Sequence, residues 1–177
     1  MKKKYFLLSF IITILSAISL AQQPVYDIHI MGWGPVKIGM SKGEVEAISG
    51  YKLNPFFSDP EYPCKTYTLD KSDLKIEFMF SKNNNNYTLS RIYVSDSRIK
   101  TSSNTGIGSS KSDIIKAYYN KIEIKTHTYS DCEILVYIPI DKKESLYRIA
   151  FETDDKGIVR EYSVGKLPEI FFIEGCL

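Results

Sequence analysis

Residues 38–50 read IGMSKGEVEAISG, and residues 107–119 read IGSSKSDIIKAYY. The two stretches share isoleucine, glycine, serine and lysine at one offset of 69 residues, and acidic and β-branched residues follow at matching places. A capping motif alone is common to many helices, but this many matches at one offset indicate an internal repeat. The sequence therefore predicts that one structural unit is built twice.

The repeated phrase predicts a short helix in each half. In the first copy Ser41 and Glu44 form a capping box, in which the serine oxygen accepts from the third helical amide and the glutamate accepts from the serine amide. A glycine follows that suits the left-handed turn at a helix end, so the helix is expected over residues 42–49. In the second copy Ser110 and Asp113 take the same places.

Alternating apolar residues after each helix predict antiparallel strands. An extended piece and then a hairpin are expected in both halves. The hairpin strands lie at 74–80 and 89–95, around an asparagine-rich turn, and at 147–153 and 158–164, around Asp-Asp-Lys-Gly. The offset of 69 recurs in the last strands, where Leu89, Arg91 and Tyr93 correspond to Ile158, Arg160 and Tyr162.

The predicted fold class is α+β, with two tandem repeats of a short helix plus an antiparallel sheet. Repeat one is expected over about residues 32–98 and repeat two over about 103–177. Neither half has enough strands for a core of its own, so we expect the two sheets to join or to pack together.

The first 21 residues have the layout of a secretory signal peptide. Three lysines precede an uncharged run over residues 5–20, and small residues precede a cleavage position after Ala21. An uncleaved anchor is the alternative, but the run is short for a spanning helix. We therefore expect residues 22–177 to be one exported domain, periplasmic or secreted, without stable membrane insertion after cleavage.

The charge balance gives no reason to expect a nucleic-acid partner. The chain has 23 basic and 21 acidic residues, and three of the lysines would be lost when the leader is cleaved. The remaining 20 basic and 21 acidic residues leave the exported part close to neutral.

Three cysteines suggest one disulfide and one further thiol in an oxidising compartment. We predict a bond between Cys64 and Cys176, since it would hold the last residues against the body of the protein. Sequence alone leaves the other pairings open.

Few residues invite a catalytic interpretation. His127, Asp131 and Cys132 lie close together in the sequence, as a Cys–His nucleophile would require. On a continuous strand, however, positions five apart face opposite sides. No metal-ligand spacing or phosphate-binding glycine loop is present, so we expect no enzyme activity, cofactor or metal.

Trp33 is the one candidate for contact with a partner. It is the only tryptophan and lies in Gly-Trp-Gly-Pro ahead of the first helix. An exposed tryptophan there would be an anchor for a partner, whereas a buried one would fill the end of a small core.

Ile38-Gly39-Met40-Ser41 and Ile107-Gly108-Ser109-Ser110, each followed by a short helix and an antiparallel sheet, resemble the beta-lactamase inhibitory protein fold. Small outer-membrane assembly lipoproteins carry single copies of a similar unit. The resemblance implies a sheet face that binds another protein, of the inhibitor or assembly-factor type.

The chain also resembles an uncharacterised family of bacterial exported proteins. The shared strings are GWGPVKIGM at 32–40, Arg-Ile-x-Val at 91–94, Thr…GIG at 105–108, a His-x-Tyr pair at 127–129, FETD at 151–154 and a terminal EGC at 174–176. This likeness implies an exported location and no known reaction.

We therefore expect a non-enzymatic protein of the cell envelope that binds another envelope protein. The alternative is a module that binds a small ligand or glycan on an aromatic sheet face. The chain has 13 tyrosines and nine phenylalanines, which suit either surface, unless most of them fill the core.

Overall fold

The computed structural model describes residues 25–59, 61–126, 132–172 and 175–176. In this part of the chain two short helices, α1 (Lys42–Ser49) and α2 (Lys111–Tyr118), accompany antiparallel sheets, so the fold is α+β as predicted. No described helix is both long and apolar enough to cross a membrane. The predicted leader and His127 lie outside the described residues.

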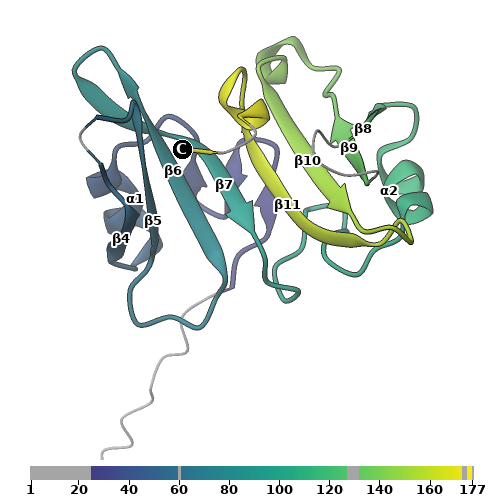
Figure 1. The fold of residues 1–177 in the computed structure, drawn as a ribbon, viewed down its shortest axis with the longest axis horizontal. Helices are drawn as coiled ribbons and strands as arrows, with labels where there is room; N and C mark the ends of the chain where they lie inside the picture. The colour runs from purple at the N-terminus through teal and green to yellow at the C-terminus, as the bar shows by residue number, and fades with distance from the viewer. Residues whose placement is uncertain (1–24, 60, 127–131, 173–174, 177) are drawn as a thin grey trace, which may run out of the picture.

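Eight strands form one large sheet in the order β4-β5-β6-β7-β11-β10-β9-β8. Their bounds are β4 (Leu53–Phe57), β5 (Cys64–Leu69), β6 (Ile76–Asn83), β7 (Asn86–Val94), β8 (Ile122–Thr126), β9 (Glu133–Tyr137), β10 (Tyr147–Thr153) and β11 (Val159–Lys166). Helix α1 precedes β4 to β7, and α2 precedes β8 to β11. The two sets of four strands meet where β7 pairs with β11, so they join edge to edge (Figure 1).

Three two-residue strands form a second, small sheet of β1 (Ile28–His29), β2 (Gly32–Trp33) and β3 (Val36–Lys37). This sheet and both helices lie on one face of the large sheet, which we call the inner face. The other face, the outer face, is turned toward the viewer in Figure 1. The chain end crosses it, after the 3-10 turn η2 (Glu169–Phe171); a second such turn, η1 (Lys142–Glu144), precedes β10.

Both predicted capping boxes are present. The hydroxyl of Ser41 accepts from the amide of Glu44, whose carboxylate accepts from the amide of Ser41 at 2.7 Å. Ser110 and Asp113 make the same two bonds at the start of α2. The predicted bounds of the first helix, residues 42–49, agree with those of α1.

The glycine before each cap fixes the helix to the sheet. Gly39 donates to the carbonyl of Leu89 at 2.7 Å, and Leu89 donates back to the residue after the glycine. In the second half, Gly108 donates to the carbonyl of Val159, and Val159 donates to the carbonyl of Ser109, at 2.9 Å each. Both glycines have φ near +90°, at +100° and +87°, where a side chain is strained. The repeated phrase therefore encodes both a helix start and a docking turn.

The predicted strand equivalence at offset 69 is wrong by one residue. The docking turns make Val159, not Ile158, the counterpart of Leu89. A β-bulge follows in each strand and leaves Ser90 and Arg160 without an opposite residue. Because a one-residue slip changes the face of a strand, Tyr93 lies on the outer face whereas Tyr162 is buried in the core.

Trp33 belongs to the core, which corrects its assignment as a partner contact. Its side chain is 0% exposed, and its indole N–H donates to the carbonyl of Tyr26 at 2.8 Å. The rings of Tyr26, Tyr51 and Phe78 surround it at centroid distances of 5.2–5.9 Å. The main core lies between the inner face, the helices and the small sheet.

Candidate functional site

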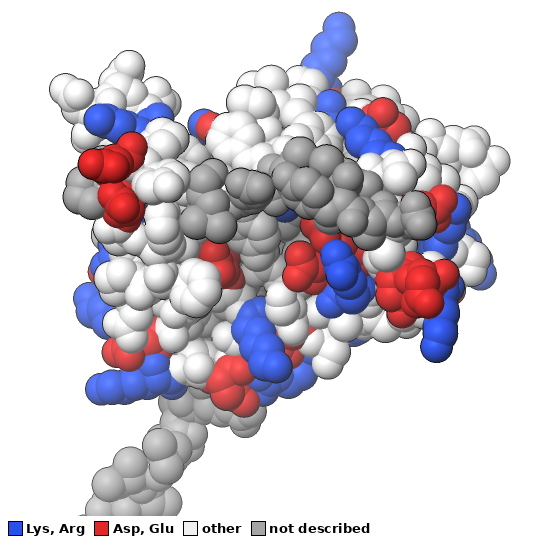
Figure 2. Space-filling view, viewed as in Figure 1, with Lys and Arg blue, Asp and Glu red and all other residues white. Residues whose placement is uncertain are grey.

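The middle of the outer face is polar. Glu77 on β6 lies opposite Tyr93 on β7, and Tyr93 lies opposite Ser163 on β11. One row away on the sheet, Glu152 lies opposite Glu161. Figure 2, which views the same face, shows acidic and basic side chains side by side around a hollow. We call these five residues, together with Arg91, the outer-face centre.

Arg91 is the buried cation of this centre, with only 6% of the residue exposed. Its Nε donates to the Ser163 hydroxyl at 3.2 Å, and its Nη1 donates to the carbonyl of Phe172 at 2.9 Å. The guanidinium also lies 4.2 Å from the ring centroid of Tyr93. Burial lowers the pKa of Arg91, while Tyr93 and the nearby carboxylates oppose that shift. The side chain therefore connects two strands to the C-terminal segment.

The C-terminal segment is held against the outer face by the predicted disulfide. Cys64 and Cys176 are bonded, and both are buried with Met79 in a small cluster on this face. Phe57 and Tyr93 pack against the same cluster. The described end of the chain is thus fixed by a covalent bond and by Arg91.

Glu77 is half-buried beside this segment. Burial raises the pKa of its carboxyl above the ordinary value, and the negative charge of Glu161 adds to the effect. A carboxyl with a raised pKa holds its proton more tightly in the folded than in the unfolded state. The folded state is therefore disfavoured as pH rises through the interval between the two pKa values.

We accordingly predict that Glu77→Gln stabilises the protein at pH 7 by about 0.5–1 kcal/mol, since burial penalises the charged carboxylate whereas the amide carries no charge. The advantage should shrink as pH falls through the interval between the folded and the unfolded pKa, and it should be absent below the unfolded pKa of about 4.3. Thermal unfolding of both proteins between pH 3 and pH 8 measures this difference. A constant difference across that range, or a loss of stability at pH 7, would contradict the prediction.

A hollow of about 330 Å³ opens next to Glu77 and Tyr93. Hydroxyl and charged side chains line it, contributed by β5, by the loop before β6, by β6 itself and by the end of β7. They are Thr68, Ser72, Asp73, Lys75, Glu77, Tyr93 and Ser95. Its walls are thus mainly hydrogen-bonding groups, and Leu74 and Ile76 complete the lining. Such a lining suits a polar group of a ligand or of a partner protein.

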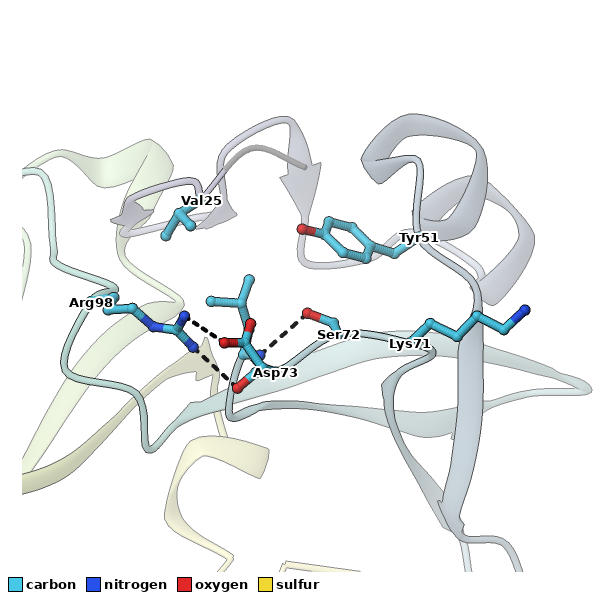
Figure 3. A pocket seen from close by; sticks show the side chains of 7 residues that line it. Val25, Tyr51, Lys71, Ser72, Asp73 and Arg98 are labelled. Atoms are coloured by element: carbon cyan, nitrogen blue, oxygen red, sulfur yellow. Dashed lines mark hydrogen bonds and ion pairs between the residues drawn. The ribbon is translucent and has the colours of Figure 1, made fainter. Parts of the chain in front are cut away.

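A second hollow, of about 310 Å³, lies on the other side of the same loop (Figure 3). The Tyr51 hydroxyl points across it toward Val25, and Asp73 accepts from the guanidinium of Arg98 at 2.8 Å. Arg98 also holds the buried carboxylate of Asp96 at 2.7 Å, which keeps the pKa of Asp96 well below its usual range. Arg98 and Asp96 therefore fix the loop that separates the two hollows.

Of the three residues considered for catalysis, only Cys132 lies within the described part of the chain. Cys132 is half-buried and lies outside the disulfide, whereas its sequence neighbours His127 and Asp131 are outside the described residues. His29 has a structural role, because its Nδ1 accepts from the Met31 amide and its Nε2 donates to the Gly34 carbonyl at 2.9 Å. Within the described ranges no group of three or more His, Cys, Asp or Glu is placed to hold a metal ion.

Known proteins add little to this geometry. No protein-family model matches the chain, and no curated protein matches it. Among solved structures, it is similar to a DUF4309 family protein (YjgB) from Bacillus subtilis subsp. subtilis str. 168. The two chains are 18% identical, the match covers 71% of this chain and 78% of that one, and the TM-score is 0.44. At that score the likeness carries no weight for function.

Sequence reasoning did not identify the outer-face centre. Arg91 and Tyr93 were noted as parts of a strand, but their side-chain direction depends on the bulge at Ser90. The signal that was available is the clustering of charged residues in strands, with Glu77 within β6 and Glu161 within β11. Charges at such positions are unusual unless they face solvent or one another.

Proposed function

We propose that the chain is an exported, non-enzymatic protein of the cell envelope that binds another protein through the outer face of its large sheet. The observation that carries this proposal is the asymmetry of the two faces. Both helices and the small sheet cover the inner face, while among the described residues only the C-terminal segment crosses the outer one. A large sheet face that no described helix or second sheet covers is a surface on which a partner fits.

The chemistry of the outer-face centre supports a protein as the partner. It combines a tyrosine, a buried arginine and several carboxylates, and Tyr and Arg are enriched at the energetic centres of protein interfaces. Phe171 and Phe172, on the C-terminal segment that Arg91 holds, add partly exposed rings, with 37% and 38% of their surface open. Most other aromatic residues are in the core, which limits the aromatic contact area expected from the sequence.

The disulfide supports export, since such bonds persist in oxidising compartments. The leader expected at residues 1–21 would deliver the chain there. We propose a periplasmic or secreted location on these two grounds.

We also infer that the two halves arose by tandem duplication and that their arrangement is similar to the beta-lactamase inhibitory protein fold. Matching details support this inference. Each half has a capped helix, a glycine turn docked on its last strand and a bulge directly after the docking residue, which is Leu89 in one half and Val159 in the other. The mirrored strand order places the two last strands side by side.

The test is a cross-linking pull-down from envelope extracts with the exported protein. We expect one partner in near-equal amount, at least tenfold depleted when Ser95→Arg places a long cation at the rim of the outer-face hollow. Ser112→Arg, on the exposed side of α2, is the matched control and should keep the partner. Equal recovery with Ser95→Arg would exclude the outer face as the contact.

A small ligand or glycan is the second candidate, favoured by the two hollows on either side of residues 71–74. A pull-down without any partner would contradict the protein-binding proposal. A glycan that raises the melting temperature of the protein, and not that of the Ser95→Arg variant, would then identify the hollow beside Tyr93 as the site.

A further inference from the structure

The two edge strands of the large sheet differ in a way that bears on association. At one edge, β4 contains Pro55, and its pairing with β5 is irregular between Pro55 and Phe57. The amide of Asp70 donates to the carbonyl of Lys52, so the backbone groups of Lys52 face β5. Because this direction alternates along an antiparallel strand, the nitrogen of Pro55 faces the free side of β4. Proline and bulges are the devices that prevent edge-to-edge pairing. The β4 edge is therefore blocked.

The opposite edge, β8, is open. It pairs with β9 without a shift over all five of its residues, and in the described part of the chain no strand lies on its other side. It contains no proline or glycine. The apolar side chain of Ile124 is 45% exposed at this edge. A regular, exposed edge strand is a template for another strand.

The direction of the backbone groups of β8 follows from one hydrogen bond. The amide of Ile138 donates to the carbonyl of Lys121 at 2.8 Å, and these two residues continue the β8–β9 register. In an antiparallel pair, bonded residues alternate with residues whose amide and carbonyl point away. The amides and carbonyls of Ile122, Ile124 and Thr126 therefore point to the free side.

We propose that two copies of this chain pair antiparallel along β8, about a two-fold axis at Ile124. In that register Ile124 lies opposite its own copy, and Ile122 lies opposite Thr126 of the other copy. All three pairs present free amides and carbonyls to each other, which gives about six backbone hydrogen bonds. The contact is self-complementary, as a closed two-fold dimer requires.

Charge selects this register over its neighbours. Glu123 and Lys125 project from the outer face, where their charged groups lie 3.7 Å apart, and 50% and 39% of their side chains stay exposed. Pairing about Ile124 sets Glu123 of one copy opposite Lys125 of the other, twice. A shift of the axis to Glu123 sets two glutamates opposite each other, and a shift to Lys125 sets two lysines opposite each other. Opposite charges across strands are favourable and like charges unfavourable.

The experiment is sedimentation equilibrium of the protein, produced from the full chain in exporting cells. Protein concentrations of about 10 μM to 1 mM are needed, because an interface made by one short strand from each copy is small and binds weakly. We expect a monomer–dimer equilibrium. Glu123→Lys and Lys125→Glu should each weaken self-association by about tenfold to thirtyfold, because both cross-strand pairs become repulsive. An equimolar mixture of these two variants restores opposite charges at both positions and should recover dimers with wild-type affinity.

Ile124→Pro is the backbone control. It removes an amide that would bond the second copy and leaves the bonds to β9, so we expect it to abolish dimers without unfolding the chain. A strictly monomeric wild-type protein at 1 mM would overturn the proposal. So would dimers that persist in Ile124→Pro, or variants that stay monomeric when mixed.

Discussion

Replacing Trp33 with alanine is expected to lower the free energy of unfolding by about 3–5 kcal/mol, the range for a buried large aromatic side chain. The indole is 0% exposed and lies among three other rings, so its removal leaves a cavity between the small sheet and the large one. The Tyr26 carbonyl would also lose its donor. Urea unfolding followed by circular dichroism measures the change.

Trp33→Phe is the control for this cavity. It keeps an aromatic ring but not the N–H donor, and we expect it to cost about half as much as alanine. The emission of the wild-type protein should be blue-shifted and inaccessible to iodide. If iodide quenched that emission and Trp33→Ala lowered the free energy of unfolding by less than about 1 kcal/mol, Trp33 would be an exposed residue available for contact with a partner.

The helices were predictable because their signals are local. Ser41 and Glu44 act on each other within one turn, and the capping bonds depend on nothing distant in the fold. The same holds for Ser110 and Asp113. The second hairpin was predictable for a similar reason, because the turn before Val159 is marked by Asp-Asp-Lys-Gly.

The faces of the strands were not predictable, because a single bulge reverses them. Alternation places Leu89, Arg91 and Tyr93 on one face, but the bulge at Ser90 puts Leu89 in the core and the other two on the outer face. The bulge is set by pairing with β6, a tertiary contact that no local residue announces. The sequence therefore shows that charged residues lie within strands, but it does not show that they meet on one face as the outer-face centre.

The edge strands were missed for a related reason. Both β4 and β8 have short and mostly exposed sequences, with Pro55 in one and charged residues in the other. The alternation in β8 does favour a strand, but its place at the edge follows only from its pairing with β9. β4, with its proline, is a strand here because β5 pairs with it. The inference about β8 thus depends on the structure alone.

Loss of the disulfide is expected to lower the free energy of unfolding by about 4–5 kcal/mol, on the chain-entropy scale for a loop of this size. Cys64 and Cys176 are 112 residues apart, so the bond restricts most of the unfolded chain. Urea unfolding of the Cys64→Ser/Cys176→Ser variant, compared with Cys132→Ser as the control, measures the effect. We expect the control to stay within about 1 kcal/mol of the wild type, because it leaves the loop closed.

The disulfide and Arg91 hold the same segment, so their contributions should not add. With the bond intact, Arg91→Leu loses its contacts with Ser163 and Phe172, but the chain end stays tethered through Cys176. Without the bond, Ile170 still packs against Val136 and Ala150, and the hydrogen bond from Arg91 to the Phe172 carbonyl is the polar contact that holds the chain beyond it. We therefore expect Arg91→Leu to release the chain beyond Ile170 only when the disulfide is absent, detected as rapid hydrogen exchange at Phe171 and Phe172. Release by Arg91→Leu in the oxidised protein, or continued protection in the combined variant, would contradict this coupling.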